Sequence, residues 1–260
     1  MKNVLLFTAL LLTVSAANAQ KQPNIQTASI KAPATVKIDG KPTEWGAMQA
    51  YNHATDLAYT LANDEDNLYL IIQTADPSII IRAVNGRVTL TINKVDKKSE
   101  KDAVAISYPV FEKNEKAVMS VQDKLSTPKI ADSIMQLNNK RLNTKVKMIK
   151  VTGVAGLDTL ISIYNENGIK AKSAFDDKML YTCEMAVPLK LLGLSVKDAA
   201  KFAYNVRLNG VIYDDVPGIS ITRNASGEIT SMDIHKDQMI PNAGNMTAPT
   251  DFWGAYTLVR

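Results

Sequence analysis

The chain has 260 residues, a formal net charge of +4 at pH 7, 46% hydrophobic residues and one cysteine. This composition is that of a globular protein, and the single cysteine excludes a disulfide within the chain. The basic excess lies mostly in one stretch, residues 94–101, where acidic residues interrupt the lysines. A nucleic-acid-binding surface carries denser basic residues with aromatics between them, so we expect no nucleic acid among the partners.

The first 19 residues have the pattern of a secretory signal peptide. Lys2 precedes an apolar run over residues 4–14, and Ala17 and Ala19 form the small-residue motif that signal peptidase cleaves. A membrane span needs roughly twenty apolar residues, more than this run contains. We therefore expect an exported, periplasmic or extracellular protein with no membrane span after cleavage. Because no repeat or linker interrupts the rest, residues 20–260 are expected to form a single domain.

Short segments of alternating apolar and polar residues follow. The first three lie at 57–61, 68–72 and 88–92, and a period of two residues is typical of strands with one buried face. The polar turn 63–67 between the first two predicts a hairpin. Further strands are expected at 146–151, 160–164, 169–174, 180–187, 202–208 and 255–259. Hairpin spacing of this kind predicts an all-β antiparallel sandwich or barrel.

Two segments depart from this alternation. Residues 127–142 carry apolar residues at nearly helical spacing after Pro128, and a shorter helix is expected from Pro188 to Gly193. Residues 213–250 are rich in turn-forming residues, with one short strand expected at 219–222. A long excursion of this kind in a compact domain is typically functional or mobile.

The cysteine is predicted to be structural. Cys183 shares its phase with Tyr181, Met185 and Val187, the larger apolar set of its strand. It is therefore expected to face the core, where a thiol packs as a small apolar group. This placement argues against a catalytic thiol.

Three motifs resemble, in order, those of family 9 carbohydrate-binding modules. They are the segment 36–45, V-K-I-D-G-K-P-T-E-W; the strand around Asn67-Leu68-Tyr69-Leu70 with Thr74-Ala75-Asp76 at its end; and the E-x-x-x-P-x-x-x-L pattern from Glu184 to Leu192. The resemblance is closest to stand-alone, secreted members of the Bacteroidetes type and spans most of the mature chain. It implies an Ig-like or jelly-roll β-sandwich and a carbohydrate ligand. Family membership alone does not fix a function.

The resemblance also bears on the site. Family members that bind sugar ends hold the ring between two tryptophans, but Trp45 occupies the framework position where we expect it to plug the sandwich. A two-tryptophan clamp is therefore not visible. If a ligand face exists, we expect it to use Trp253, Tyr204 and Tyr213, with Arg207, Asp214 and Asp215 as hydrogen-bonding partners. The alternative is that these are ordinary strand and loop residues.

Metal and cofactor sites have little support in the sequence. The acidic runs at 64–66 and 214–215 leave a structural calcium ion open as an alternative to turn chemistry, although neither fits an EF-hand loop. The two histidines, His53 and His235, belong to no zinc or covalent haem motif. Haem held by a methionine with a histidine or lysine remains an alternative. We expect no cofactor.

Catalysis is not expected either. No G-x-S-x-G motif is present, and neither histidine has an evident serine and acid partner. A glycosidase needs only two carboxylates across a cleft, which a sequence cannot reveal. The leading hypothesis is a secreted, non-catalytic carbohydrate-binding protein. The alternatives are an envelope interaction protein that has lost the sugar site, and a glycoside hydrolase or associated component of polysaccharide breakdown.

Overall fold

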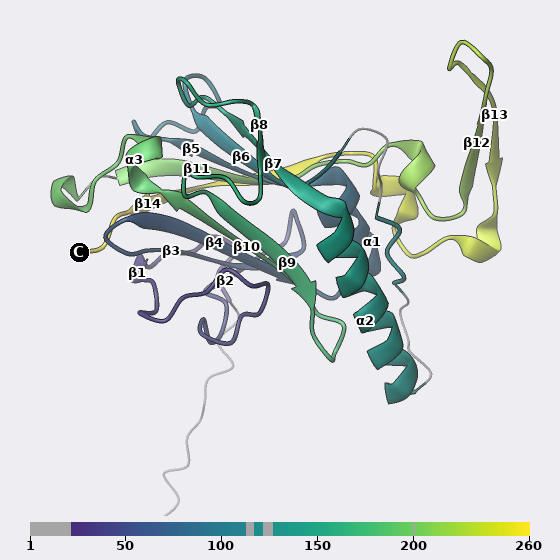
Figure 1. Ribbon diagram of the computed structural model, residues 1–260, viewed down its shortest axis with the longest axis horizontal. Helices are drawn as coiled ribbons and strands as arrows, with labels where there is room; N and C mark the ends of the chain where they lie inside the picture. Colours follow the sequence, from purple (N-terminus) through teal and green to yellow (C-terminus); the bar gives the residue numbers. More distant parts are fainter. Residues whose placement is uncertain (1–21, 113–116, 122–126, 200) are drawn as a thin grey trace, which may run out of the picture.

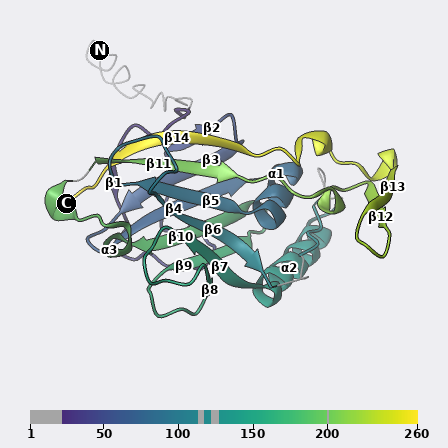
Figure 2. The same ribbon diagram turned by 90° about the horizontal axis from the view of Figure 1, so that it is seen from above.

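A computed structural model describes residues 22–112, 117–121, 127–199 and 201–260 (Figure 1). The predicted signal peptide, residues 1–19, lies outside these ranges. Two antiparallel sheets stack face to face, and Figure 2 shows one of them spread above the other. The predicted all-β antiparallel sandwich is confirmed.

Sheet A forms the lower layer. Its strands are β1 (Ile30–Lys31), β2 (Ala50–Asn52), β3 (Leu57–Asn63), β4 (Asn67–Thr74), β9 (Lys170–Phe175) and β10 (Tyr181–Pro188). The order is β1-β3-β4-β10-β9, with β2 also paired to β3. Only the short β1–β3 ladder is parallel among the described pairs. The predicted hairpin at 57–72 is the β3–β4 pair.

Sheet B forms the upper layer. Its strands are β5 (Val88–Asn93), β6 (Val104–Phe111), β7 (Val146–Thr152), β8 (Leu160–Ser162), β11 (Lys201–Leu208) and β14 (Thr250–Thr257). The order is β14-β11-β5-β6-β7-β8, so the last strand of the chain lies at the edge beside β11. This order brings together segments that are far apart in the sequence.

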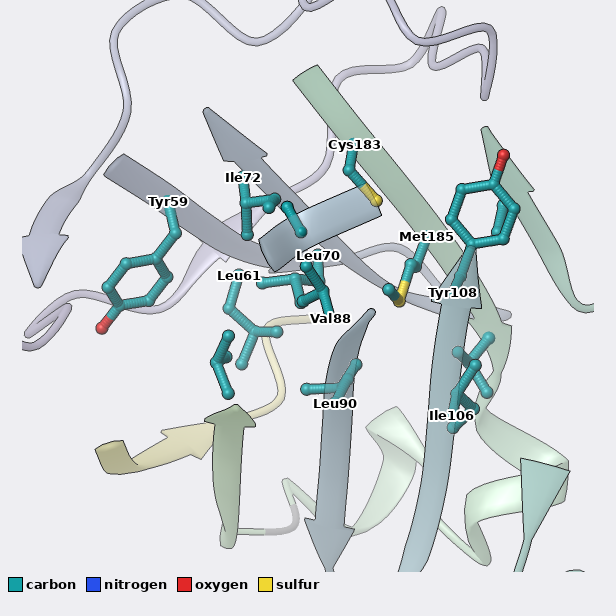
Figure 3. Packing of buried hydrophobic residues seen from close by; sticks show 14 of the residues in the cluster. Tyr59, Leu61, Leu70, Ile72, Val88, Leu90, Ile106, Tyr108, Cys183 and Met185 are labelled. Carbon is teal, nitrogen blue, oxygen red and sulfur yellow. The ribbon is translucent and has the colours of Figure 1, made fainter. Parts of the chain in front are cut away.

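The core fills the space between the two sheets (Figure 3). Leu61, Leu70 and Ile72 from sheet A meet Leu90 and Ile106 from sheet B, and all five are almost fully buried. Each belongs to the apolar phase of its strand, so the alternation in the sequence determines which side chains are removed from water.

Cys183 lies in this core, 1% exposed, as predicted (Figure 3). Burial raises the pKa of its thiol far above the ordinary value. The thiolate, which is the reactive form, is therefore suppressed.

A second, smaller core covers the outer face of sheet A. Trp45 packs there with Met48, Ile71 and Tyr69, its ring centroid 5.7 Å from that of Tyr69. Trp45 is 7% exposed. Trp45 is therefore a packing residue, as expected, but it packs against the outer face of sheet A and not between the two sheets.

Glu184 binds the segment that covers this face, residues 36–48, to the sheet. Its Oε2 accepts hydrogen bonds from the backbone N–H groups of Asp39, at 3.0 Å, and Gly40, at 2.7 Å, while its Oε1 accepts from Trp45 Nε1 at 2.9 Å. Gly40 has φ +82°, and a Cβ at this position would lie 2.8 Å from the backbone nitrogen of Ala174. The I-D-G-x-x-x-x-W segment and the glutamate of the third motif are thus parts of one structural contact.

The two predicted helices are present. The helix α2 (Pro128–Lys145) begins after Thr127, whose Oγ1 accepts the Ile130 N–H at 3.3 Å, and α3 (Leu189–Leu192) ends at Gly193 in the left-handed conformation. α2 also covers the free edge of sheet A, because the Asn139 side chain donates to Phe175 O at 2.9 Å and accepts Phe175 N–H at 2.8 Å.

A helical turn after β4 was not predicted. It comprises α1 (Pro77–Ile81) and a π-helical turn, Arg82–Gly86. Asp76 caps it, with Oδ1 accepting the N–H groups of Ser78 at 2.8 Å and Ile79 at 3.0 Å. Aspartate followed by proline is a start signal for a helix, but the run of three isoleucines is equally typical of a strand.

The excursion 213–250 contains a hairpin that stands away from both sheets (Figure 1). The expected strand at 219–222 is β12 (Ile219–Arg223), and its partner β13 (Ile229–Ile234) was not predicted. Ile219 lies opposite Ile234 and Ile221 opposite Met232, so one face of this hairpin is apolar. All of β13 is exposed.

No helix in the described part of the chain has both the length and the apolar character needed to cross a lipid bilayer.

Candidate binding face

The outer face of sheet B carries two rows of side chains that cross five strands. Directly paired residues of an antiparallel ladder lie on the same face. The first row is Trp253, Asn205, Thr91, Ala105 and Thr152, and the second is Asp251, Arg207, Thr89, Ser107 and Lys150. Their neighbours along the strands point into the core. We call these ten residues the outer strip.

Trp253 is the aromatic residue of the outer strip. It lies on edge strand β14, half-buried, with buried Asn205 opposite it on β11. The amide of Asn205 donates to Asp251 Oδ2 at 2.5 Å and to Phe252 O at 3.0 Å. The indole therefore stands beside a polar cluster that is fixed by hydrogen bonds.

The loop between β5 and β6 folds over one side of this face. The Asn93 amide donates to Ser99 O at 2.9 Å and to Lys101 O at 3.2 Å, which holds the loop down. Glu100 then reaches Arg207, with Oε1 2.5 Å from Nη2. The lysine-rich stretch 94–101 is thus a solvated turn that helps to orient Arg207.

A groove of about 660 Å³ opens over the other end of the outer strip. Thr89, Ser107 and Lys150 line it together with the segment after β11 and the end of the π-helical turn. The Thr89 and Ser107 hydroxyls are 2.9 Å apart, and Asn209 Nδ2 donates to Thr89 Oγ1 at 3.0 Å. The groove therefore has a hydrogen-bonded polar floor.

The wall of this groove is held in an unusual backbone conformation. Arg87 has φ 79° and ψ 150°, a region almost confined to glycine, directly after the π-helical turn. Asn209 holds it there, since its N–H and its Nδ2 donate to Arg87 O at 3.1 and 2.9 Å. Backbone strain and π-helical turns both occur preferentially at functional sites.

Three buried polar atoms around this face have no hydrogen-bond partner among the described residues. They are Asn205 Oδ1 and Arg207 Nε on the outer strip and Asn85 Oδ1 in the groove wall. Buried polar atoms in folded proteins are nearly always satisfied by protein, water or ligand. The described residues hold three more such atoms, in Arg82, Ser173 and Tyr181, which belong neither to the outer strip nor to the groove lining.

The predicted site residues are only partly brought together. Trp253 and Arg207 lie on adjacent strands of the outer strip, and Asp215 lines the groove. Tyr213, 48% exposed, lies in the same 3₁₀ turn as Asp215. Asp214 instead pairs with Arg223 of the hairpin, its Oδ2 2.7 Å from Nη2.

The prediction for Tyr204 was wrong. Its side chain is 0% exposed and faces the core, where its hydroxyl lies 3.0 Å from that of Tyr59. Tyr204 shares its phase with Phe202 and Val206, so alternation along β11 places it on the inner face. A ligand on the outer face cannot reach it.

The sequence did not reveal Lys150, Ser107, Thr89 or Asn209. The polar phase of residues 88–92 was a signal for a solvent-facing row, but its neighbours could not be identified without the strand order. Register is what joins residues from β5, β6 and β7 into one surface.

In the first acidic run, residues 64–66, the carboxylate of Asp64 stabilises a turn. Asp64 Oδ1 accepts the N–H groups of Asp66 at 2.8 Å and Asn67 at 2.6 Å, and its Oδ2 accepts the Tyr69 hydroxyl at 2.6 Å. Burial alone would raise the pKa of Asp64, but these hydrogen bonds outweigh it and leave the pKa below its ordinary value. Within the ranges that the structure describes, no three histidine, cysteine or acidic side chains are arranged to hold a metal ion.

Comparison with known proteins gives one structural likeness to report. No protein-family model matches the chain, and no curated protein matches it. Among solved structures, the chain is similar to a carbohydrate binding module of family 9 from Caldicellulosiruptor kristjanssonii, determined in complex with glucose. The alignment covers 89% of this chain and 95% of that one, at 11% identity and a TM-score of 0.35. The sandwich assignment itself rests on the two sheets described above.

Proposed function

We propose that the chain is an exported, non-catalytic glycan-binding protein whose mature part, residues 20–260, is one domain. Its ligand lies on the outer strip of sheet B. The observation that carries this proposal is the position of half-buried Trp253 at one end of a polar row that leads into the groove. We further propose that this binding serves the breakdown of extracellular polysaccharide.

The chemistry of a sugar suits this surface. The apolar C–H face of a pyranose lies well against an aromatic ring, while its hydroxyls need both donors and acceptors at fixed positions. The outer strip offers the Trp253 indole, the Arg207 guanidinium and the Asp251 carboxylate, with the Thr89 and Ser107 hydroxyls beyond them.

Binding should depend on Trp253. We expect Trp253→Ala to weaken retention on a bound polysaccharide at least tenfold, since stacking against an aromatic ring is lost, with little change in the midpoint of urea unfolding. The measurement is affinity electrophoresis through gels containing hydroxyethylcellulose, xylan, glucomannan or laminarin. Tyr164→Ala is the matched control, because Tyr164 is 78% exposed in the loop after β8, away from the strip. Equal retention of wild type and Trp253→Ala would place the ligand elsewhere.

A second candidate function is an envelope interaction protein. Tyr164, Tyr213 and Trp253 lie on three different elements rather than in one cluster, and the apolar face of the β12–β13 hairpin is exposed. Exposed apolar surface of this kind is typical of protein contacts.

Removing the hairpin tests whether it takes part in polysaccharide binding. Gly218 O accepts His235 N–H at 2.7 Å, so the base of the hairpin is closed and residues 220–233 can be replaced by two glycines. Because the hairpin pairs with neither large sheet, we expect the variant to unfold cooperatively and to retain polysaccharide binding within twofold. Loss of polysaccharide binding in this variant with a retained fold would place the polysaccharide contact on the hairpin rather than on the outer strip.

A further inference from the structure

We propose that the ligand is an internal stretch of an extended, uncharged polysaccharide chain that lies across the strands of sheet B, with Trp253 at one end and Lys150 at the other. This inference rests on the proposed function and adds the class of ligand. It predicts recognition of several successive sugar units in the middle of a chain, not of a single sugar or a chain end.

The length of the outer strip supports several sugar units. Its second row, whose five residues are exposed or half-buried, crosses β14, β11, β5, β6 and β7 in turn, whereas Asn205 and Thr91 of the first row are buried. Adjacent strands lie about 4.8 Å apart, so the rows extend over roughly 19 Å. A single pyranose covers little more than one such spacing, and would leave either Trp253 or the groove without a contact.

The strip is open at both ends. Trp253 belongs to edge strand β14, and beyond Lys150 the ladder continues only to Leu160 of edge strand β8, which is 52% exposed. Figure 2 shows these two strands at opposite borders of the sheet. A site for a chain end needs a closed wall against the next sugar, whereas this surface lets a chain continue in both directions.

The charges around the strip balance. Arg207 is paired with Glu100, and the groove lining contains Arg87 and Lys150 together with Glu112 and Asp215. A polyanionic chain would meet carboxylates beside each of these cations, so the surface offers it no net attraction. A neutral polyhydroxyl chain instead finds donors and acceptors of both kinds.

The unpaired atoms follow the same path. Asn205 Oδ1 lies in the first row and Arg207 Nε in the second, while Asn85 Oδ1 lies in the groove wall. Asn205 and Arg207 share strand β11 and thus one position along the strip, whereas Asn85 lies apart from them in the groove wall. A chain or its bridging waters would run past each of them.

The test uses the full mature protein and a ladder of oligosaccharides. The polymer that retains the protein best in the gel panel is cut to one to six units, and the affinity of each is measured by isothermal titration calorimetry. We expect affinity to rise at least tenfold between two and five units and then level off. Borohydride reduction of the chain end should change the affinity of the longest oligosaccharide by less than twofold. Polygalacturonate, a charged chain, should not bind.

Variants at the two ends locate the chain. Trp253→Ala and Lys150→Met should each weaken binding of the six-unit oligosaccharide at least threefold, and a two-unit oligosaccharide should respond to only one of them. Lys170→Met, at an exposed lysine of sheet A, is the control. Equal affinity for one and six units, dependence on a free chain end, or preference for polygalacturonate would each overturn this inference while leaving glycan binding intact. Failure to bind any polymer would overturn the proposed function itself.

Discussion

Replacing Glu184 with alanine is expected to lower the free energy of unfolding by about 3–5 kcal/mol. Glu184 is fully buried, and its carboxylate accepts three hydrogen bonds, from two backbone N–H groups and from Trp45 Nε1. Each buried donor left without a partner costs about 1–3 kcal/mol. The loss should be visible in urea unfolding as a lower midpoint.

The control for this prediction is Glu65→Ala, at an exposed glutamate of the β3–β4 turn. A surface change of this kind is expected to alter the free energy of unfolding by no more than about 0.5 kcal/mol. If Glu184→Ala unfolds within 1 kcal/mol of wild type, roughly the net value of one hydrogen bond, then the covering segment 36–48 does not depend on this carboxylate.

Glu184→Gln removes the ionisable carboxyl group while it keeps the size of the side chain. Burial raises the pKa of Glu184 to about 7, although its three hydrogen bonds act in the opposite direction. The native state then binds a proton more tightly than the unfolded state, so this stabilising contribution is complete below about pH 4.5 and is lost as the pH rises through about 7. We expect the glutamine variant to show a flatter dependence of stability on pH over that interval. An unchanged slope would assign the dependence to other groups.

Gly254→Ala is expected to destabilise the protein by about 3 kcal/mol, because overpacking of a filled core forces neighbouring side chains out of place. A Cβ at Gly254 would lie 2.3 Å from Tyr204 Cζ and 2.4 Å from its hydroxyl oxygen. The Tyr204 ring cannot move aside easily, since it is buried and its hydroxyl lies against that of Tyr59. Thermal and urea unfolding measure the effect.

Two variants show whether this contact is the cause. Gly244→Ala is the matched control, because a Cβ there meets nothing within 4 Å, and it should be nearly neutral. Combining Gly254→Ala with Tyr204→Leu should cost less than the sum of the two single changes, since leucine leaves room for the added methyl. Strict additivity would show that the alanine acts through something other than the tyrosine ring.

Much of the fold could be predicted because alternation reports burial directly. Most strands of both sheets show it, as does the core position of Cys183, but β6 and the short strands β1 and β2 were not predicted. α1 was not predicted because three consecutive isoleucines fit a buried strand as well as a helix. β13 was not predicted because polar residues surround it within a turn-rich excursion. In both segments, tertiary surroundings determine the conformation where local pattern is ambiguous.

The candidate site was less predictable for a geometric reason. Trp253 and Arg207 were identified from their residue types, but Tyr204 was chosen without regard to its phase in β11. Lys150 becomes a neighbour of this face only through three successive ladders between β11 and β7. No local pattern encodes which strands will be adjacent, so a surface assembled across a sheet has to be seen in three dimensions.

The contact between Asn139 and β9 has a consequence for how the molecule behaves at high concentration. The side-chain amide of this helical residue occupies both the N–H and the C=O of Phe175, which are the groups that an incoming strand from another molecule would need. α2 therefore blocks the addition of a foreign strand at the Phe175 end of β9, and the charged side chains of Lys170 and Lys172 protect the rest of this edge strand from fibrillar stacking.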